Sequence, residues 1–176
     1  MRALVVYESM FGNTRNVALA VAEGIGTKMA VEAIEVGAAP AKLASDVGLL
    51  VVGCPTHIHG MSTAKSRATA SERAGGPIIS SGAGMREWLA TLRPEPGLTA
   101  AAFDTRTSGP MIFTGSAAKT AAKLLRRAGL RQVDEPRSFV LEGPTDQLAD
   151  RVPTQELAAA RAWGEGLAAD LGDARP

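Results

Sequence analysis

A short polar segment near the amino terminus carries the residue types of an anion-binding loop. It follows the apolar run 4–7, precedes a helical pattern, and consists of Ser9, Met10, Phe11, Gly12, Asn13 and Thr14. The start of a helix presents unpaired N–H groups and the positive end of the helix dipole. Gly12 removes a side chain where the backbone would turn inward, so a phosphate dianion could be held here without a lysine. An ordinary helix cap made by Asn13 or Thr14 is the competing interpretation.

Two later segments, 53–60 and 104–109, follow predicted strands and should meet this loop. In an open parallel sheet the ligand crevice lies outside the carboxyl ends of the strands, where the strand order reverses. The first segment holds His57 and His59 shortly after Cys54. Imidazoles and a thiolate are zinc ligands, but Cys54 ends an apolar strand pattern and the sequence offers no evident fourth ligand. We therefore favour histidines that contact a bound organic ligand over a metal site.

The elements that must position these loops alternate along the chain. Apolar runs predict buried strands at 4–7, 49–52 and 98–103, a more polar edge strand at 31–36, and a fifth strand at 138–141. Apolar residues at helical spacing, Trp88 and Trp163 among them, predict helices at 13–25, 85–92, 117–128 and 154–171. The pattern predicts a three-layer α/β/α domain with a five-stranded parallel sheet in the order 2-1-3-4-5.

Length and composition narrow the class of protein. The 176 residues suit a single domain, with 61–76 predicted as an irregular loop near the site, 142–153 as a functional or mobile connection, and 172–176 as a flexible tail. No apolar run reaches the roughly 18 residues of a membrane span. A net charge of +1 without a basic cluster argues against nucleic-acid and membrane partners. A lone cysteine and the lack of a secretory pattern predict a cytoplasmic protein.

The loop segments also resemble those of flavodoxins. Ser-x-x-Gly-Asn-Thr after the first strand is similar to the family's phosphate loop, and Val51 to Thr56 and Phe103 to Thr105 are similar to the approaches to its two ring-contacting loops. The resemblance implies a flavodoxin-like sandwich that binds FMN, with the phosphate held by Ser9 to Thr14. It implies further cofactor contacts from Pro55, Thr56, His57, Ile58, His59, Gly60, Asp104, Thr105 and Arg106. No catalytic or metal-binding residue is assigned.

Differences from the family bear on how such a site would be used. Flavodoxins usually stack the flavin between aromatic side chains, each worth roughly 1 kcal/mol beyond burial. Here His57 takes the first position, and 104–109 includes no aromatic residue. Flavodoxins are typically acidic, whereas this chain places basic residues on the predicted site side, which favours an acidic redox partner or an anionic substrate. They are Lys65, Arg67, Arg73, Arg86 and Arg106.

The leading hypothesis is an FMN-binding redox protein that exchanges electrons with a protein partner. A small FMN-dependent NAD(P)H or quinone-type reductase stays open, with 61–76 as its lid. A binding module that has lost its flavin also stays open, because one fold serves several functions. A phosphoacceptor receiver with the same sheet order is excluded, because Gly53-Cys54-Pro55 stands where the third strand would have to end in an aspartate.

Overall fold

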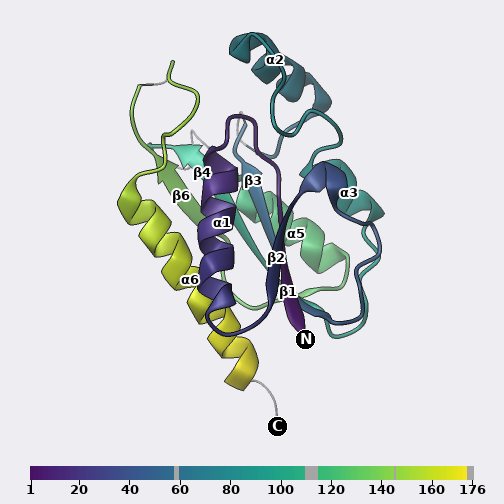
Figure 1. Cartoon of the computed structure of the whole chain (residues 1–176). Helices are drawn as coiled ribbons and strands as arrows, with labels where there is room; N and C mark the ends of the chain where they lie inside the picture. Colours follow the sequence, from purple (N-terminus) through teal and green to yellow (C-terminus); the bar gives the residue numbers. More distant parts are fainter. Residues whose placement is uncertain (58–59, 110–114, 145, 174–176) are drawn as a thin grey trace.

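A parallel β-sheet forms the middle layer of the computed structural model, which describes residues 1–57, 60–109, 115–144 and 146–173 (Figure 1). Strands β1 (Arg2–Tyr7), β2 (Val31–Glu35), β3 (Val47–Pro55) and β4 (Thr99–Thr107) lie in the order β2-β1-β3-β4. Two short strands, β5 (Arg131–Gln132) and β6 (Arg137–Leu141), pair with β4 on its other side. The predicted order 2-1-3-4-5 is confirmed, although two strands share the fifth position.

Helices cover both faces of the sheet. On one side lie α1 (Asn13–Gly26) and α6 (Thr154–Asp173), and on the other lie α3 (Met85–Thr91) and α5 (Ala117–Arg127). A short 3-10 helix, η1 (Val36–Ala38), follows β2. Figure 1 shows the remaining helix, α2 (Ala64–Ala74), beyond the carboxyl ends of the strands and apart from both layers. In the described part of the chain, no helix combines the length and apolar character needed to cross a bilayer.

The alternation of side chains along each strand divides the core in two. Val5 and Val51 face α1 and α6, whereas Val6 and Val52 face α3 and α5. Trp163 packs in the first half, edge-on to two phenylalanines, at 6.1 Å between ring centroids from each. The core position predicted for it is confirmed.

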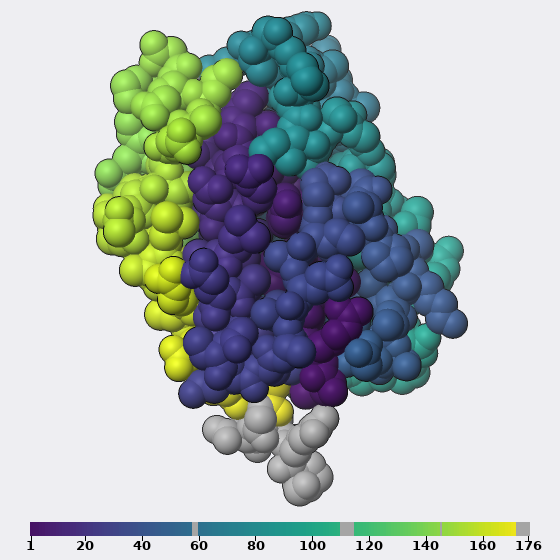
Figure 2. Space-filling view, viewed as in Figure 1, coloured from purple at the N-terminus to yellow at the C-terminus, as the bar shows by residue number. Residues whose placement is uncertain are grey.

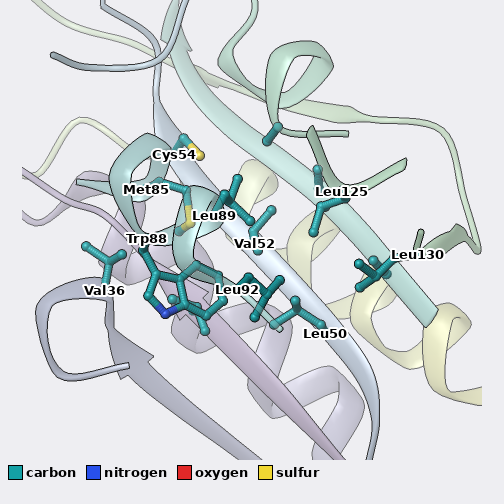
Figure 3. Packing of buried hydrophobic residues seen from close by; sticks show 14 of the residues in the cluster. Val36, Leu50, Val52, Cys54, Met85, Trp88, Leu89, Leu92, Leu125 and Leu130 are labelled. Carbon is teal, nitrogen blue, oxygen red and sulfur yellow. The ribbon is translucent and has the colours of Figure 1, made fainter. Parts of the chain in front are cut away.

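The second half of the core includes the buried side chains of α3. Figure 3 shows Met85, Trp88 and Leu89 of this helix beside Val52 of β3. Trp88 is buried, as predicted, and its Nε1 donates to the carbonyl of Pro40 at 3.2 Å. Cys54 belongs to the same cluster. Its complete burial raises the pKa of the thiol, and the carboxylates of Glu8 and Asp104 raise it further, so it packs as a small neutral side chain.

The prediction of an irregular loop at 61–76 is wrong, because 64–74 form α2. A capping box begins the helix: Thr63 Oγ1 accepts from the Ser66 N–H at 3.2 Å, and Ser66 Oγ accepts from the Thr63 N–H at 2.9 Å. Gly75, in the left-handed region at φ 65°, ends it. Only Arg67 and Ala70 of this helix are buried, so the apolar periodicity that would predict it is missing.

The chain end also differs from its prediction. Residues 172–173, predicted as part of a flexible tail, are the last residues of α6. The other three, 174–176, lie outside the described residues.

Candidate functional site

The predicted loops meet at the carboxyl ends of the strands, around a cavity of about 280 Å³. Ten of the predicted site residues line it: Ser9, Met10, Phe11, Asn13, Thr14, Pro55, Thr56, His57, Thr105 and Arg106. Gly12 and Gly60 support the loops without lining the cavity, and Ile58 and His59 lie outside the described residues. Further lining residues were not among the predicted cofactor contacts: Arg73, Thr107, Leu141, Gln147, Leu148 and Arg151.

The first loop turns sharply into α1. Gly12 stands immediately before the helix in the left-handed region, at φ 94°, where a side chain is disfavoured. Ser9 Oγ accepts from the N–H groups of Gly12 and Arg15 at 3.2 and 3.3 Å, which closes the loop on itself. Gly12 has no capping side chain, and N–H groups in the first turn have no intrahelical partner. The loop therefore offers main-chain donors to an anion.

Hydroxyl groups join the first loop to the end of β4. Thr14 Oγ1 and Thr105 Oγ1 lie 2.8 Å apart and share a hydrogen bond, although 91 residues separate them in the chain. Both residues are almost completely buried beside the cavity. This contact fixes the start of α1 against the second predicted loop.

The loop after β3 is fixed at both of its ends. The Thr56 N–H donates to the Thr105 carbonyl at 2.9 Å, and Thr56 Oγ1 accepts from the Ala117 N–H at 3.1 Å. His57 and Gly60 exchange two main-chain hydrogen bonds, of 2.7 and 2.8 Å. Burial lowers the pKa of His57, and the charge of Arg67 lowers it further, so the imidazole is neutral near pH 7.

Asp104, predicted to contact the cofactor, points away from the cavity. Its carboxylate is buried, and Oδ2 accepts from Ser116 Oγ at 2.7 Å and from the Ala118 N–H at 2.9 Å. The predicted fourth strand stops at residue 103, whereas β4 continues to Thr107 and places Asp104 opposite Cys54 inside the sheet. The aspartate therefore holds the start of α5 instead of a ligand.

A fourth segment, residues 147–151, adds to the cavity wall. The side chain of Asn13 binds it twice: Nδ2 donates to the Leu148 carbonyl at 2.8 Å, and Oδ1 accepts from the Arg151 N–H at 3.0 Å. The space-filling view shows this yellow-green segment and the teal α2 on either side of the purple start of α1 (Figure 2). The sequence predicts Asn13 only as a possible local helix cap. It does not predict the contact of Asn13 with a residue 135 positions away in the chain.

A buried ion network lies directly beside the first loop. Glu8, the residue before Ser9, is completely buried; its Oε1 accepts from Ser62 Oγ, and its Oε2 accepts from the Met85 N–H at 2.8 Å. Arg67 approaches Glu8 Oε1 at 3.9 Å and donates to Ser62 Oγ at 2.9 Å. Its Nη2 also donates to Glu87 Oε1, at 2.9 Å. We call Glu8, Ser62, Arg67 and Glu87 the Glu8 network.

This network corrects the prediction that Arg67 belongs to an exposed basic surface, because Arg67 is only 6% exposed. Burial raises the pKa of Glu8, although its hydrogen bonds and Arg67 oppose that effect. Burial would also raise the pKa of Glu87, but the hydrogen bond from Arg67 and the charge of Arg67 hold it below its usual value. A Cβ atom on Gly84 would lie 2.3 Å from Arg67 Nη1, so the guanidinium fits only beside a glycine.

Charge and shape together indicate which ligands the cavity can hold. Arg73, Arg106 and Arg151 line it, and none of the described residues that line it is an Asp or Glu. Its volume lies near the lower end of small-molecule sites, roughly 300 Å³. Main-chain donors at a helix start, hydroxyl groups and guanidinium groups form a donor set suited to a phosphate. The donor set of the cavity therefore suits a phosphate-bearing ligand.

A comparison with models of known protein families assigns this chain to a family. The sequence model of the family described as Flavodoxin matches residues 5–164. None of the curated protein sequences is significantly similar to this chain.

Similar solved structures cover nearly the whole chain. A flavodoxin from the domain Archaea has a TM-score of 0.66 and 20% identity, with 98% of this chain and 99% of the other covered. Oxidised flavodoxin 1 from Bacillus cereus has a TM-score of 0.66 and 16% identity, with both chains fully covered. A flavodoxin, WrbA-like protein from Agrobacterium tumefaciens has a TM-score of 0.53 and 20% identity, with 99% of each chain covered. At these identities the structural similarity establishes the fold alone.

Proposed function

Because the chain belongs to the flavodoxin family, we propose that it binds FMN in the cavity at the carboxyl ends of the strands and exchanges electrons with a protein partner. When bound, FMN supplies the capacity to accept and release electrons. The protein supplies a shaped site, fixed hydrogen-bond donors and a local charge.

The observation that carries this proposal is the construction of the first loop. Gly12 adopts a positive φ, and Ser9 Oγ fixes the turn. Asn13 and Thr14, the first residues of α1, line the cavity at the helix end whose N–H groups lack intrahelical partners. Arg151, held close to Asn13, adds positive charge beside this loop. A monoester dianion satisfies these donors, and an uncharged ligand would leave them without an acceptor.

The rest of the cavity suits the remainder of the cofactor. Pro55, Thr56 and His57 line it from the end of β3, and Thr105 and Arg106 line it from the end of β4. These segments come from adjacent strands, so a flat ring could lie between them. The neutral imidazole of His57 can donate or accept a hydrogen bond there without adding charge.

We further propose an acidic redox protein as the partner. Lys65 and Arg73 on α2 and Arg86 on α3 are exposed at the same end of the molecule as the cavity. Arg67 is removed from this set, because it is buried against Glu8 and Glu87. Exposed lysine and arginine steer acidic surfaces during encounter.

A small FMN-dependent reductase that uses NAD(P)H or a quinone is the second candidate. It is favoured by the position of α2, which places Arg73 in the wall of the cavity. Reduction of the bound flavin by NADPH alone would select the reductase. Reduction that needs a separate flavoprotein or iron–sulfur protein would select the electron carrier.

Titration of the purified protein with FMN and with riboflavin tests the proposal. The two ligands share the isoalloxazine ring, and only FMN carries the phosphate. We expect FMN to be retained through gel filtration and to bind at least tenfold more tightly than riboflavin. Equal affinities would refute the phosphate role of the first loop. No retention of FMN at excess ligand would leave a binding module that has lost its flavin.

A further inference from the structure

Asn13, the first residue of α1, joins the first loop to a segment that follows β6. Its Nδ2 donates to the Leu148 carbonyl at 2.8 Å, and its Oδ1 accepts from the Arg151 N–H at 3.0 Å. All three residues line the cavity. Figure 1 shows the yellow-green chain between β6 and α6 extending past the carboxyl ends of the strands. A single amide side chain therefore ties two walls of the cavity together.

The other hydrogen bonds of this segment close it on itself. Arg151 donates from Nε to the Glu142 carbonyl at 3.0 Å and from Nη2 to the Gly143 carbonyl at 3.2 Å. The Glu142 N–H donates back to the Arg151 carbonyl at 2.9 Å. Among the described residues, 147–151 form no hydrogen bond with the sheet or its helices other than the two to Asn13. The place of the segment in the cavity wall therefore depends on Asn13.

A turn in an uncommon backbone conformation presents the segment to this side chain. Asp150, immediately before Arg151, has a φ of 53°, in the left-handed region that residues other than glycine rarely adopt. Such a conformation persists where surrounding contacts hold it. The turn directs the Leu148 carbonyl and the Arg151 N–H to the same amide. Asp150 itself is exposed and does not line the cavity, so its backbone can be changed without altering the side chains of the site.

We propose that Asn13 is a positioning residue that sets how fast FMN leaves the cavity, because it holds residues 147–151 in the cavity wall. The inference rests on the proposed FMN site and adds control of cofactor release to it. While both bonds are made, Leu148 and Arg151 lie beside the ligand. When both break, the segment keeps its internal bonds and can move away from α1, which opens the cavity beside the first loop.

Replacement of Asn13 by alanine tests this role from the helix. Two hydrogen bonds are lost, so we expect Asn13→Ala to release FMN about tenfold faster than wild type. We expect the association rate to change by less than about threefold, since a loosely held segment does not obstruct entry. Stopped-flow flavin fluorescence measures release after dilution of the complex and association after mixing. Asn16→Ala is the matched control: Asn16 lies on the same helix, and its side chain forms no hydrogen bond with the described residues, so both rates should stay at wild-type values.

Replacement of Asp150 by proline tests the same role from the segment. Proline fixes φ at about −65°, which is incompatible with the observed 53°. The change removes no atom of the cavity lining, and we expect it also to speed FMN release about tenfold. Asp150→Asn is its control. It removes the carboxylate but tolerates a positive φ, so it should not release FMN faster than wild type.

The double variant Asn13→Ala/Asp150→Pro separates this role from a general weakening of the structure. If both changes free the same segment, the double variant should release FMN no faster than the faster single variant. Multiplied effects, or wild-type release from Asn13→Ala, would overturn the inference and leave the FMN site standing. So would fast release from Asn13→Ala with wild-type release from Asp150→Pro, because Asn13 would then act on the ligand directly. If wild-type protein does not retain FMN, the proposed function is refuted and the inference with it.

Discussion

The cavity and the Glu8 network lie side by side at the carboxyl edge of the sheet, yet they differ in the signs of the charged side chains that they contain. In the network, the guanidinium of Arg67 lies between the carboxylates of Glu8 and Glu87, and almost no water reaches it. In the cavity, the charged side chains of the described lining are Arg73, Arg106 and Arg151. The network places its one cation against carboxylates of its own, whereas the described lining of the cavity contains arginines and no Asp or Glu. We expect the first arrangement to stabilise the fold and the second to suit the anionic ligand that we propose.

Helix α2 connects the two regions. It contributes Arg67 to the network and Arg73 to the cavity wall, and its only other buried side chain is Ala70. Because the helix is otherwise polar, the network is its main attachment to the sheet. Damage to the network should therefore disturb the cavity, whereas changes inside the cavity should leave the network intact.

The largest effect is expected from Arg67→Met. The change leaves the buried carboxylate of Glu8 without its cation, and loss of one partner of a buried pair costs about 3–5 kcal/mol. Urea unfolding at pH 7 measures the free energy of unfolding, and FMN titration of the folded variant reports the displacement of α2. Glu87→Gln is the control: the Glu87 side chain is 42% exposed, so it should cost at most about 1 kcal/mol. A loss below about 1 kcal/mol for Arg67→Met would show that the network does not stabilise the fold.

The difference between local patterns and long-range contacts explains how much of the fold could be predicted from the sequence. The apolar runs of β1 and β3 and the helical stripe of α5 are local patterns, and they predict these elements and the order of the sheet. Helix α2 lacks such a pattern, since its buried contact is made by an arginine whose partners are 20 and 59 residues distant. A buried, paired arginine and an exposed one look alike in a sequence.

The candidate site shows the same limit. Loops that follow neighbouring parallel strands must converge, and the resemblance to flavodoxins implied which of their residues contact the cofactor; ten of these residues line the cavity. Asp104 was misplaced because β4 extends to Thr107 and pairs with β6, a tertiary contact. Arg151 and Leu148 were missed because they reach the cavity through the side chain of Asn13. No local signal marks such contacts.

Gly12→Asp should produce the second-largest effect, confined to the cavity. It places a side chain at φ 94° and adds negative charge beside the proposed phosphate position. We expect FMN affinity to fall about 100-fold, or about 2.7 kcal/mol, from backbone strain and charge repulsion together. Gly12→Asn tests the strain without the charge and should cost less. Isothermal titration with FMN and with riboflavin separates the effects, because riboflavin is insensitive to the repulsion. Equal losses for both flavins would place the phosphate elsewhere.

The smallest of the three effects is the pH dependence of folding stability that Glu8 of the network causes. Burial raises the pKa of Glu8 above its ordinary value of 4.5, so between the two values the native state holds a proton that the unfolded chain has lost. This contribution to stability is complete below pH 4.5 and is lost as the pH rises through the native pKa.

The glutamine of the Glu8→Gln variant cannot ionise, so this variant does not lose folding stability in this way as the pH rises. The variant should therefore become more stable relative to wild type as the pH rises from 4 to 7, by about 1.4 kcal/mol for each unit by which burial raises the native pKa. The pKa of Glu87 is lowered and gives a slope of opposite sign, but it is present in both proteins and cancels in the difference. Urea unfolding across this range measures the two curves. Parallel curves would mean that Glu8 titrates as it does in the unfolded chain, and that the contrast between a buried network and a solvent-accessible cavity does not extend to this carboxylate.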